Sequence, residues 1–296
     1  MPSPEHEAVV KRLLESTDLI DSPTIEIQRQ RYDERLGAFP IAKGVTFVSD
    51  NIEHIPVEWI EPNNPKGTIL YLHGGGYTIG SIVSFRALCS AIAIYTQCRV
   101  CLIDYRLAPE HPFPAAVDDG LLAYRWLLDR KKVNPSSLAI AGDSAGGGLT
   151  LATLINVKQS QLPLPRCASV LSPWTDLLNS GESMTSGEVN DPIFGKGPAD
   201  ALAQLYSPAE KLMNPLVSPL YGDLAGLPPI LMQVGTREAL LDDSRRFAAK
   251  ARSASVEIDY FEGEGLVHVW PLIAPQAPET SEALSRMGSF VSKHLR

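Results

Sequence analysis

The chain has 296 residues, of which 44% are hydrophobic and 20% are charged, an ordinary composition for one globular α/β domain. Acidic and basic residues are mixed along the sequence and give a net charge of −8, which argues against nucleic acid or an anionic membrane as a partner. The first residues lack the basic and then apolar pattern of a secretion signal, and no run of about 18 apolar residues occurs. We therefore expect a cytoplasmic protein that acts on a neutral small molecule.

Apolar runs of strand length alternate with segments of helical pattern through most of the chain. Residues 45–60 begin this rhythm with a predicted antiparallel pair of strands. Further strands are predicted at 68–72, 100–103, 138–140, 168–171 and 229–234, and helices at about 83–97, 114–132, 145–158, 242–254 and 276–295. Strands that are apolar almost throughout are buried on both faces. The pattern therefore predicts an α/β fold with a mostly parallel sheet between helices.

Two polar or mixed segments do not follow this rhythm. Residues 1–38 precede the first strands, and residues from about 180 to 213 follow the strand predicted at 168–171. We interpret the first as an N-terminal cap segment and the second as a cap insertion within a catalytic domain that spans 39–296. A mobile N-terminal tail together with a long surface loop is the alternative interpretation.

All four cysteines lie in apolar segments, at positions 89, 98, 101 and 167. The spacing of Cys98 and Cys101 is also found in redox and metal sites. However, residues 99–104 have the pattern of a buried strand, in which alternation puts positions 98 and 101 on opposite faces. We therefore predict core thiols and no metal site. A chain of this length also buries enough surface to fold without a disulfide or a metal, so no cofactor is required for stability.

Residues 138–152 predict a strand, a very tight turn and a helix, with Ser144 at the tip of the turn. Such an elbow needs small residues two positions before and after the serine, and Gly142 and Gly146 supply them. The turn exposes the hydroxyl at the carboxyl end of the sheet, where the positive end of the helix stabilises developing negative charge. A phosphate-binding loop is the competing interpretation, but the lysine and hydroxyl residue that end such a loop are absent. Ser144 is therefore the candidate nucleophile.

A serine hydroxyl needs a base, and the base needs an acid to orient it. Of the six histidines, His6 and His54 precede the core strands, and His294 lies almost at the end of the chain. His268 lies in a glycine-rich loop after the last predicted strand, where loops at the carboxyl edge of the sheet carry catalytic groups. We therefore predict His268 as the base.

The acid is expected between Ser144 and His268 because a nucleophile elbow of this kind orders its triad as serine, acid and histidine. The segment after strand 229–234 offers three carboxylates. Glu238 lies in the loop itself, whereas Asp242 and Asp243 open the following helix and suit its first turn or cap. We predict Glu238 as the acid, with Asp242 as the second candidate.

Residues 73–76 read His-Gly-Gly-Gly and leave the strand predicted at 68–72. Glycines let backbone N–H groups face inward, and each preorganised donor to an oxyanion contributes about 3 to 4 kcal/mol. Two of these three glycines, together with the N–H of Ala145, would form a three-donor oxyanion hole. A flexible glycine turn is the alternative. We interpret His73 as a scaffold for the loop rather than as a second base.

Three motifs occur in order, at 73–76, 104–114 and 142–146, and the late histidine follows them. Together they resemble the hormone-sensitive-lipase-like family of bacterial carboxylesterases, over residues from about 45 to the end. The resemblance implies the α/β-hydrolase fold, no metal or organic cofactor, and a cap made of the N-terminal segment and the insertion. It also implies Gly75, Gly76 and Ala145 as oxyanion donors, with Gly74 adjacent, and it is compatible with a homodimer.

One departure from the family pattern concerns the acid. The family usually has aspartate followed by Pro-Leu-Arg-Asp where this chain has Glu-Ala-Leu-Leu-Asp at 238–242, so the aligned acid is Glu238. A glutamate is adequate, because the acid holds the imidazole tautomer and stabilises its charged form.

We therefore expect a serine hydrolase that cleaves short- to medium-chain carboxylic esters through an acyl-enzyme. Two alternatives remain open. One is a non-catalytic module of the same fold that binds a small ligand. The other is an amidase, peptidase or long-chain lipase with the same triad, because pocket shape selects the leaving group and chain length.

Overall fold

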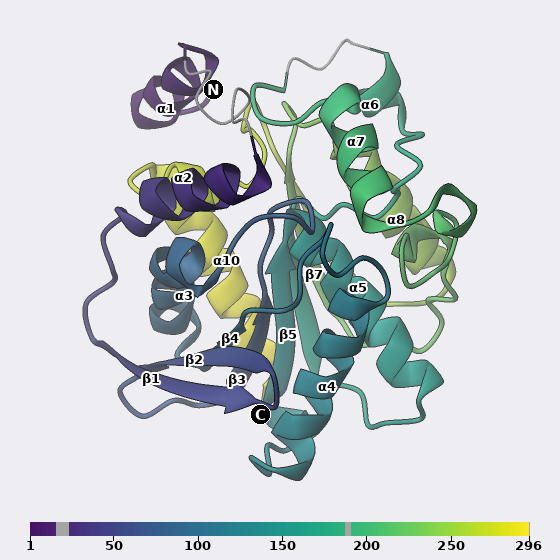
Figure 1. Cartoon of the computed structure of the whole chain (residues 1–296). Coiled ribbons are helices and arrows are strands. Elements are labelled where there is room, and N and C mark those ends of the chain that lie inside the picture. Colours follow the sequence, from purple (N-terminus) through teal and green to yellow (C-terminus); the bar gives the residue numbers. More distant parts are fainter. Residues whose placement is uncertain (16–23, 187–190, 296) are drawn as a thin grey trace.

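The computed structural model describes residues 1–15, 24–186 and 191–295 (Figure 1). Its strands are β1 (Val45–Ile52), β2 (Ile55–Pro62), β3 (Thr68–Leu72), β4 (Arg99–Ile103), β5 (Leu138–Asp143), β6 (Cys167–Leu171), β7 (Ile230–Gly235) and β8 (Ile258–Gly263). Its helices are α1 (Pro4–Glu15), α2 (Ile25–Gly37), α3 (Ile82–Thr96), α4 (Ala115–Asp129), α5 (Ser144–Gln159), α6 (Glu182–Thr185), α7 (Lys196–Tyr206), α8 (Leu241–Ser253), α9 (Trp270–Ile273) and α10 (Pro278–His294). Short 3-10 turns lie at Pro135–Ser137, Ala209–Lys211 and Pro219–Tyr221.

The eight strands form one sheet in the order β1-β2-β4-β3-β5-β6-β7-β8. Strand β2 is antiparallel to both β1 and β4, and every other neighbouring pair is parallel. The predicted fold class, a mostly parallel sheet that opens with an antiparallel pair, is confirmed. In this register Leu72 at the end of β3 lies opposite Gly142 near the end of β5. The carboxyl ends of these two strands therefore meet at one edge of the sheet.

Helices cover both faces of the sheet, with α3 and α10 on one side and α4, α5 and α8 on the other (Figure 1). Alternate strand residues feed the two cores. Cys98 packs in the core with α3 and α10, whereas Cys101 packs in the core with α4, α5 and α8. Their predicted separation by the sheet is confirmed, and all four cysteines are buried free thiols.

Strand β8 was not predicted from the sequence. Most of its residues are only half-buried because β8 pairs with β7 alone and forms an edge of the sheet. Such a strand has no continuous apolar run and is easily read as part of a loop. The loop that contains His268 therefore follows β8, not the strand that was predicted at 229–234.

The described parts of the two predicted cap segments contain helices α1 and α2 and helices α6 and α7. Residues 16–23 and 187–190 of these segments lie outside the described residues. Helix α2 is attached through Arg29, whose Nε donates to the carbonyl of Thr78 (2.8 Å) and whose Nη2 donates to that of Ala108 (2.9 Å). The guanidinium also forms an ion pair with Glu110. Helix α2 is thus bonded to the segment that follows residues 73–76.

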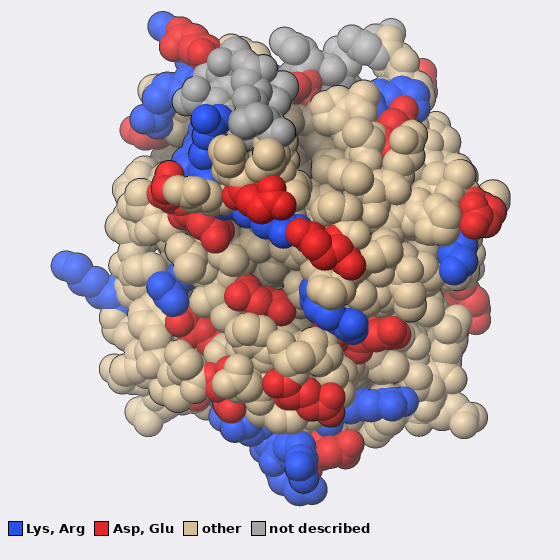
Figure 2. Space-filling view, in the orientation of Figure 1, with Lys and Arg blue, Asp and Glu red and all other residues tan. Residues whose placement is uncertain are grey.

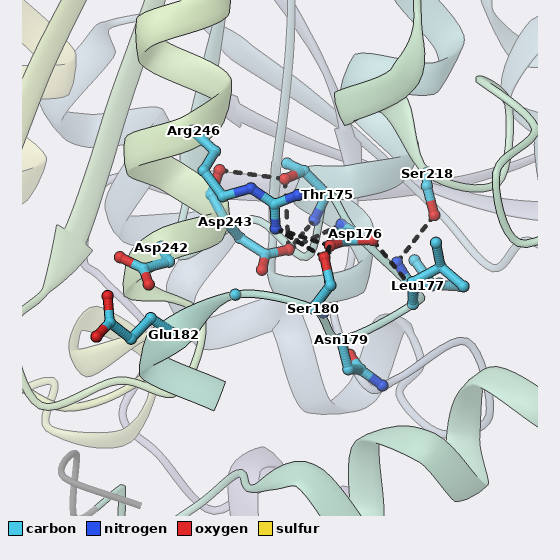
Figure 3. Close-up of polar contacts among 12 residues, drawn as sticks. Thr175, Asp176, Leu177, Asn179, Ser180, Glu182, Ser218, Asp242, Asp243 and Arg246 are labelled. Atoms are coloured by element: carbon cyan, nitrogen blue, oxygen red, sulfur yellow. Dashed lines mark hydrogen bonds and ion pairs between the residues drawn. The ribbon is translucent and has the colours of Figure 1, made fainter. Parts of the chain in front are cut away.

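The segment after β6 is attached to the first turns of α8 through buried carboxylates (Figure 3). Asp243 accepts hydrogen bonds from the backbone N–H groups of Thr175 (2.7 Å) and Asp176 (2.8 Å). Arg246, one turn further along α8, forms an ion pair with Asp176 (2.8 Å). These contacts fix the start of the chain segment that leads to α6 and α7.

Charged side chains of both signs lie side by side on the face seen in Figure 2, without an extended basic stripe. Among the helices of the described ranges, none is long and apolar enough to cross a membrane. Within the same ranges, no group of three or more histidine, cysteine or acidic side chains is arranged to hold a metal ion.

The buried carboxylate of Asp243 predicts a pH-dependent stability. Burial, and then the charge of Asp176, raise the pKa of Asp243 from 3.8 to about 7. The folded state therefore binds more protons than the unfolded state between these values, so its free energy of unfolding falls as the pH rises through them. We expect Asp243→Asn to remove this part of the decline, which urea denaturation at about pH 5 and about pH 8 would measure. Parallel losses of stability in the variant and the wild type would contradict it.

Candidate active site

Ser144 lies at the tip of a sharp turn between β5 and α5, with a positive φ of 51°. The turn packs against the end of β3. A Cβ on Gly146 would lie 2.1 Å from the carbonyl oxygen of Leu72, and a Cβ on Gly142 would lie 2.4 Å from that of Gly146. Only glycine fits at these two positions, as the sequence pattern indicated.

His268 reaches Ser144 from the loop between β8 and α9. Its Nε2 lies 2.9 Å from the Ser144 hydroxyl oxygen, and its ring is almost fully buried. The imidazole is therefore within hydrogen-bonding distance of the proton that a nucleophilic serine must lose.

Glu238 lies on the other side of the imidazole, in the loop between β7 and α8. Its Oε2 is 3.0 Å from His268 Nδ1, and its Oε1 accepts hydrogen bonds from the Ser172 hydroxyl (2.7 Å) and the Gly235 N–H (2.6 Å). The carboxylate is fully buried. The carboxylate accepts a hydrogen bond from Nδ1–H of His268. It therefore favours the tautomer in which Nε2 is free to accept a hydrogen bond from the serine hydroxyl.

Ser172 is a site residue that the sequence analysis missed. It directly follows β6 and adopts a positive φ of 47°. Its hydroxyl donates to Glu238 and accepts from the Val269 N–H (3.1 Å), so it joins the loop of the acid to the loop of the base. The available signal was its position, since residues just beyond parallel strands gather at the same edge of the sheet.

The pKa of His268 reflects two opposed effects. Burial lowers it, but the hydrogen bond and charge of Glu238, together with the negative charges of Asp191 and Asp143, outweigh burial and raise the pKa above 6.5. The site is therefore built to stabilise the imidazolium that forms when the base takes a proton.

The alternative acids make contacts elsewhere. Asp242 and Asp243 both lie in the first turn of α8, as predicted. Asp242 accepts from the Ser183 N–H (2.9 Å), whereas Asp243 accepts from the residues that follow β6 (Figure 3). Asp242 therefore binds the 180–213 segment and Asp243 binds residues that precede it, and Glu238 alone of the three is bonded to His268.

The glycine loop after β3 offers backbone donors beside the elbow. Gly75 and Gly76 have positive φ values of 113° and 60°, and a Cβ on Gly75 would lie 2.1 Å from the carbonyl oxygen of Ile79. Within the described chain, no acceptor receives a hydrogen bond from the N–H groups of Gly75, Gly76 or Ala145. These three donors therefore stay available for another acceptor.

His73 contacts this loop at its first glycine. Its Nδ1 lies 2.8 Å from the carbonyl oxygen of Gly74, and its ring stacks on Tyr105 with 4.3 Å between centroids. Burial lowers the pKa of His73 to about 4, so the ring is neutral at neutral pH. These contacts fit the predicted scaffold.

Side chains from the 180–213 segment cover the site. The ring of Phe194 stacks on the His268 imidazole, with 5.7 Å between centroids. A Cβ on Gly76 would lie 2.7 Å from the Leu202 side chain on α7, and Tyr206 at the end of α7 stacks on Tyr77 with 3.7 Å between centroids. None of the four side chains in these contacts, Phe194, Leu202, Tyr206 and Tyr77, was predicted from the sequence to belong to the site.

Asp191 connects this covering segment to the loop of the acid. Its Oδ1 accepts from the N–H groups of Ile193 and Phe194, and its Oδ2 accepts from the Ala239 N–H (2.8 Å). Asp191 thereby holds the turn that presents Phe194 to His268. It was missed because a capped turn in a segment without a motif has no fixed spacing relative to the catalytic residues.

Chemically, the assembled groups can carry out acyl transfer. A hydroxyl, a buried imidazole and a buried carboxylate form one hydrogen-bonded chain, and the glycine loop with its free backbone donors leaves β3 where that strand packs against the serine turn. This is the arrangement that activates a serine and stabilises a tetrahedral intermediate.

Comparisons with known proteins agree with this chemistry. A family model described as α/β-hydrolase fold matches residues 69–272. An acetyl-hydrolase of Streptomyces hygroscopicus is 37% identical over 98% of this chain and 97% of its own length. The crystal structure of an esterase from the bacterial hormone-sensitive lipase family has a TM-score of 0.94 at 41% identity, with 100% of both chains covered. A crystal of EstE5 soaked with p-nitrophenyl butyrate has a TM-score of 0.93 at 37% identity, covering 99% of each chain.

The contact between Glu238 and His268 predicts how the imidazole titrates. We expect Glu238→Gln to lower the pKa of His268, because the variant loses the negative charge that offsets burial. Asp242→Asn is the matched control and should leave that pKa in place. Titration of the imidazole by NMR measures both. A lowered pKa in the Asp242 variant alone would assign the partner of His268 to Asp242.

Proposed function

The chain belongs to the hormone-sensitive-lipase-like family of bacterial carboxylesterases within the α/β-hydrolase fold and is a serine carboxylesterase, and on that premise we propose that it hydrolyses short- to medium-chain esters through Ser144, His268 and Glu238. One observation carries this proposal. The Ser144 hydroxyl, the His268 imidazole and the Glu238 carboxylate form an unbroken chain of hydrogen bonds of 2.9 and 3.0 Å.

The reaction begins when Ser144 attacks the ester carbonyl and His268 Nε2 takes the hydroxyl proton. Glu238 accepts the hydrogen bond from Nδ1 and so stabilises the imidazolium. His268 then gives its proton to the leaving alcohol, which leaves an acyl group on Ser144. Water attacks this acyl-enzyme by the same route and releases the carboxylic acid.

The oxyanion of each tetrahedral intermediate is bound by the N–H groups of Gly75, Gly76 and Ala145, with Gly74 adjacent. Two features support this assignment. The donors have no acceptor within the described chain, and the N–H of Ala145 lies at the positive end of α5. Such donors stabilise the charge that develops in the transition state rather than the neutral ester.

Helices α1 and α2, together with the segment that contains α6 and α7, form a cap on the catalytic domain in this proposal. The buried aromatic pair of Tyr77 and Tyr206, and the half-buried Phe194 over the imidazole, support a preference for short to medium acyl chains, because stacked rings leave little freedom to move. Assembly as a homodimer remains a prediction.

Ser144→Ala should abolish ester hydrolysis without unfolding the protein. The hydroxyl is the nucleophile, whereas alanine fits the same turn without adding volume. Turnover of p-nitrophenyl butyrate and the melting temperature, measured on the same preparation, test this. Hydrolysis at the wild-type rate by a folded variant would exclude Ser144 as the nucleophile.

Chain-length preference follows from the covering side chains. We expect the highest kcat/KM on acetate to hexanoate esters and a loss of about tenfold or more with palmitate. A matched anilide should be a poor substrate, because the amine of an amide leaves only after its nitrogen has been protonated. Phe194→Ala provides a control for the pocket, because removal of the ring should reduce the discrimination between chain lengths. Preference for the anilide or for palmitate in the wild type would favour the amidase or lipase alternative.

A further inference from the structure

We propose that Asp143, the residue immediately before the nucleophile, is a positioning residue that holds the oxyanion loop in its donor conformation through Gly74. The inference rests on the proposed function, because it concerns the donors of that same site. Asp143 does not touch the substrate in this account. It acts on the reaction through the backbone of the neighbouring loop.

The contacts of Asp143 are unusual for its position. Asp143 is the N-cap residue of α5, where an aspartate ordinarily bonds the N–H groups of its own helix, yet its side chain makes no such bond. Instead its Oδ1 accepts from the Gly74 N–H (3.0 Å) and from the Tyr71 hydroxyl (2.8 Å). The side chain therefore crosses from β5 to the end of β3 and bonds the first glycine of the oxyanion loop.

Gly74 is a glycine for a reason of space that involves the same carboxylate. Unlike Gly75 and Gly76, Gly74 does not have a positive φ. A Cβ at this position would lie 2.2 Å from Asp143 Oδ2. The backbone of the loop thus lies directly on the carboxylate, and movement of one displaces the other.

Burying this carboxylate opposes folding, which favours a functional reason for its presence. Asp143 is almost completely buried, and burial raises its pKa to about 7 although the bonds from Tyr71 and Gly74 and the charge of His268 act in the opposite direction. An apolar side chain of similar shape would avoid this penalty. Residues that violate such stability rules concentrate at functional sites.

Asp143 also acts on the base electrostatically. The charged groups that raise the pKa of His268 are Glu238, Asp191 and Asp143, each from a different loop or strand end. Loss of the Asp143 charge should therefore ease deprotonation of His268. Position and charge can be separated experimentally, because asparagine retains an acceptor oxygen but carries no charge.

The test compares Asp143→Asn with Asp143→Ala and Asp143→Leu, the last of which keeps the branched shape but replaces the acceptor oxygens by methyl groups. For the two variants without an acceptor we expect kcat on p-nitrophenyl butyrate to fall about 100-fold, with KM nearly unchanged. The affinity for an alkyl boronic acid, which mimics the tetrahedral intermediate, should fall in parallel. Asparagine should restore kcat to within about tenfold of the wild type, because its oxygen can accept from Gly74.

The pH profile gives a second readout that a merely structural role would not change. In Asp143→Asn the acid limb of kcat/KM should shift to lower pH, because the lost negative charge had raised the pKa of His268. Asp243→Asn is the matched control. It replaces another buried carboxylate that accepts two backbone N–H groups, but on α8, and it should leave both kcat and the acid limb unchanged.

Three outcomes would overturn the proposal. The first is a wild-type kcat and a wild-type boronic acid affinity in the folded Ala or Leu variant. The second is an equal loss of kcat in the Asn and Leu variants. The third is a change that is confined to KM. If the Ala variant does not fold, the Leu and Asn pair decides the question. Inactivity of the wild type on every ester would instead contradict the proposed function, and the two failures are therefore distinguishable.

Discussion

The close contact between the nucleophile elbow and the end of β3 is the constraint on which the site depends. The α-carbon of Gly146 lies against the carbonyls of Leu72 and His73, closer than any residue with a Cβ allows. Since β3 and β5 are neighbours in the sheet, this contact brings the serine turn and the glycine loop together at one edge. The glycine loop that carries the free donors therefore begins directly beside the serine turn.

The sequence predicted the parts of the molecule whose chemistry is local. Buried parallel strands have apolar runs, and the strained turn at Ser144 requires glycines at fixed offsets, so both could be recognised without a structure. Glu238 could be separated from Asp242 and Asp243 because helix first turns attract acidic residues for reasons of their own. The contacts of all three carboxylates agree with that reasoning.

The sequence did not predict features that depend on distant segments. Ser172 joins two loops that are far apart in the chain, and Phe194 covers the imidazole from a segment without a motif. Strand β8 escaped detection because an edge strand is half exposed and lacks an apolar run. In each case the determining contact is tertiary, so no spacing along the sequence indicates it.

The attachment of α2 has a thermodynamic consequence. Arg29 bonds the carbonyl of Thr78, two residues beyond the last oxyanion glycine, so the docked position of the helix and the conformation of the loop stabilise each other. Linkage is reciprocal: a molecule that binds the loop in its donor conformation also strengthens the docking of α2 by the same free energy. We therefore expect helix α2 to report occupancy of the site, with stronger protection of its amides from hydrogen exchange when a tetrahedral mimic is bound.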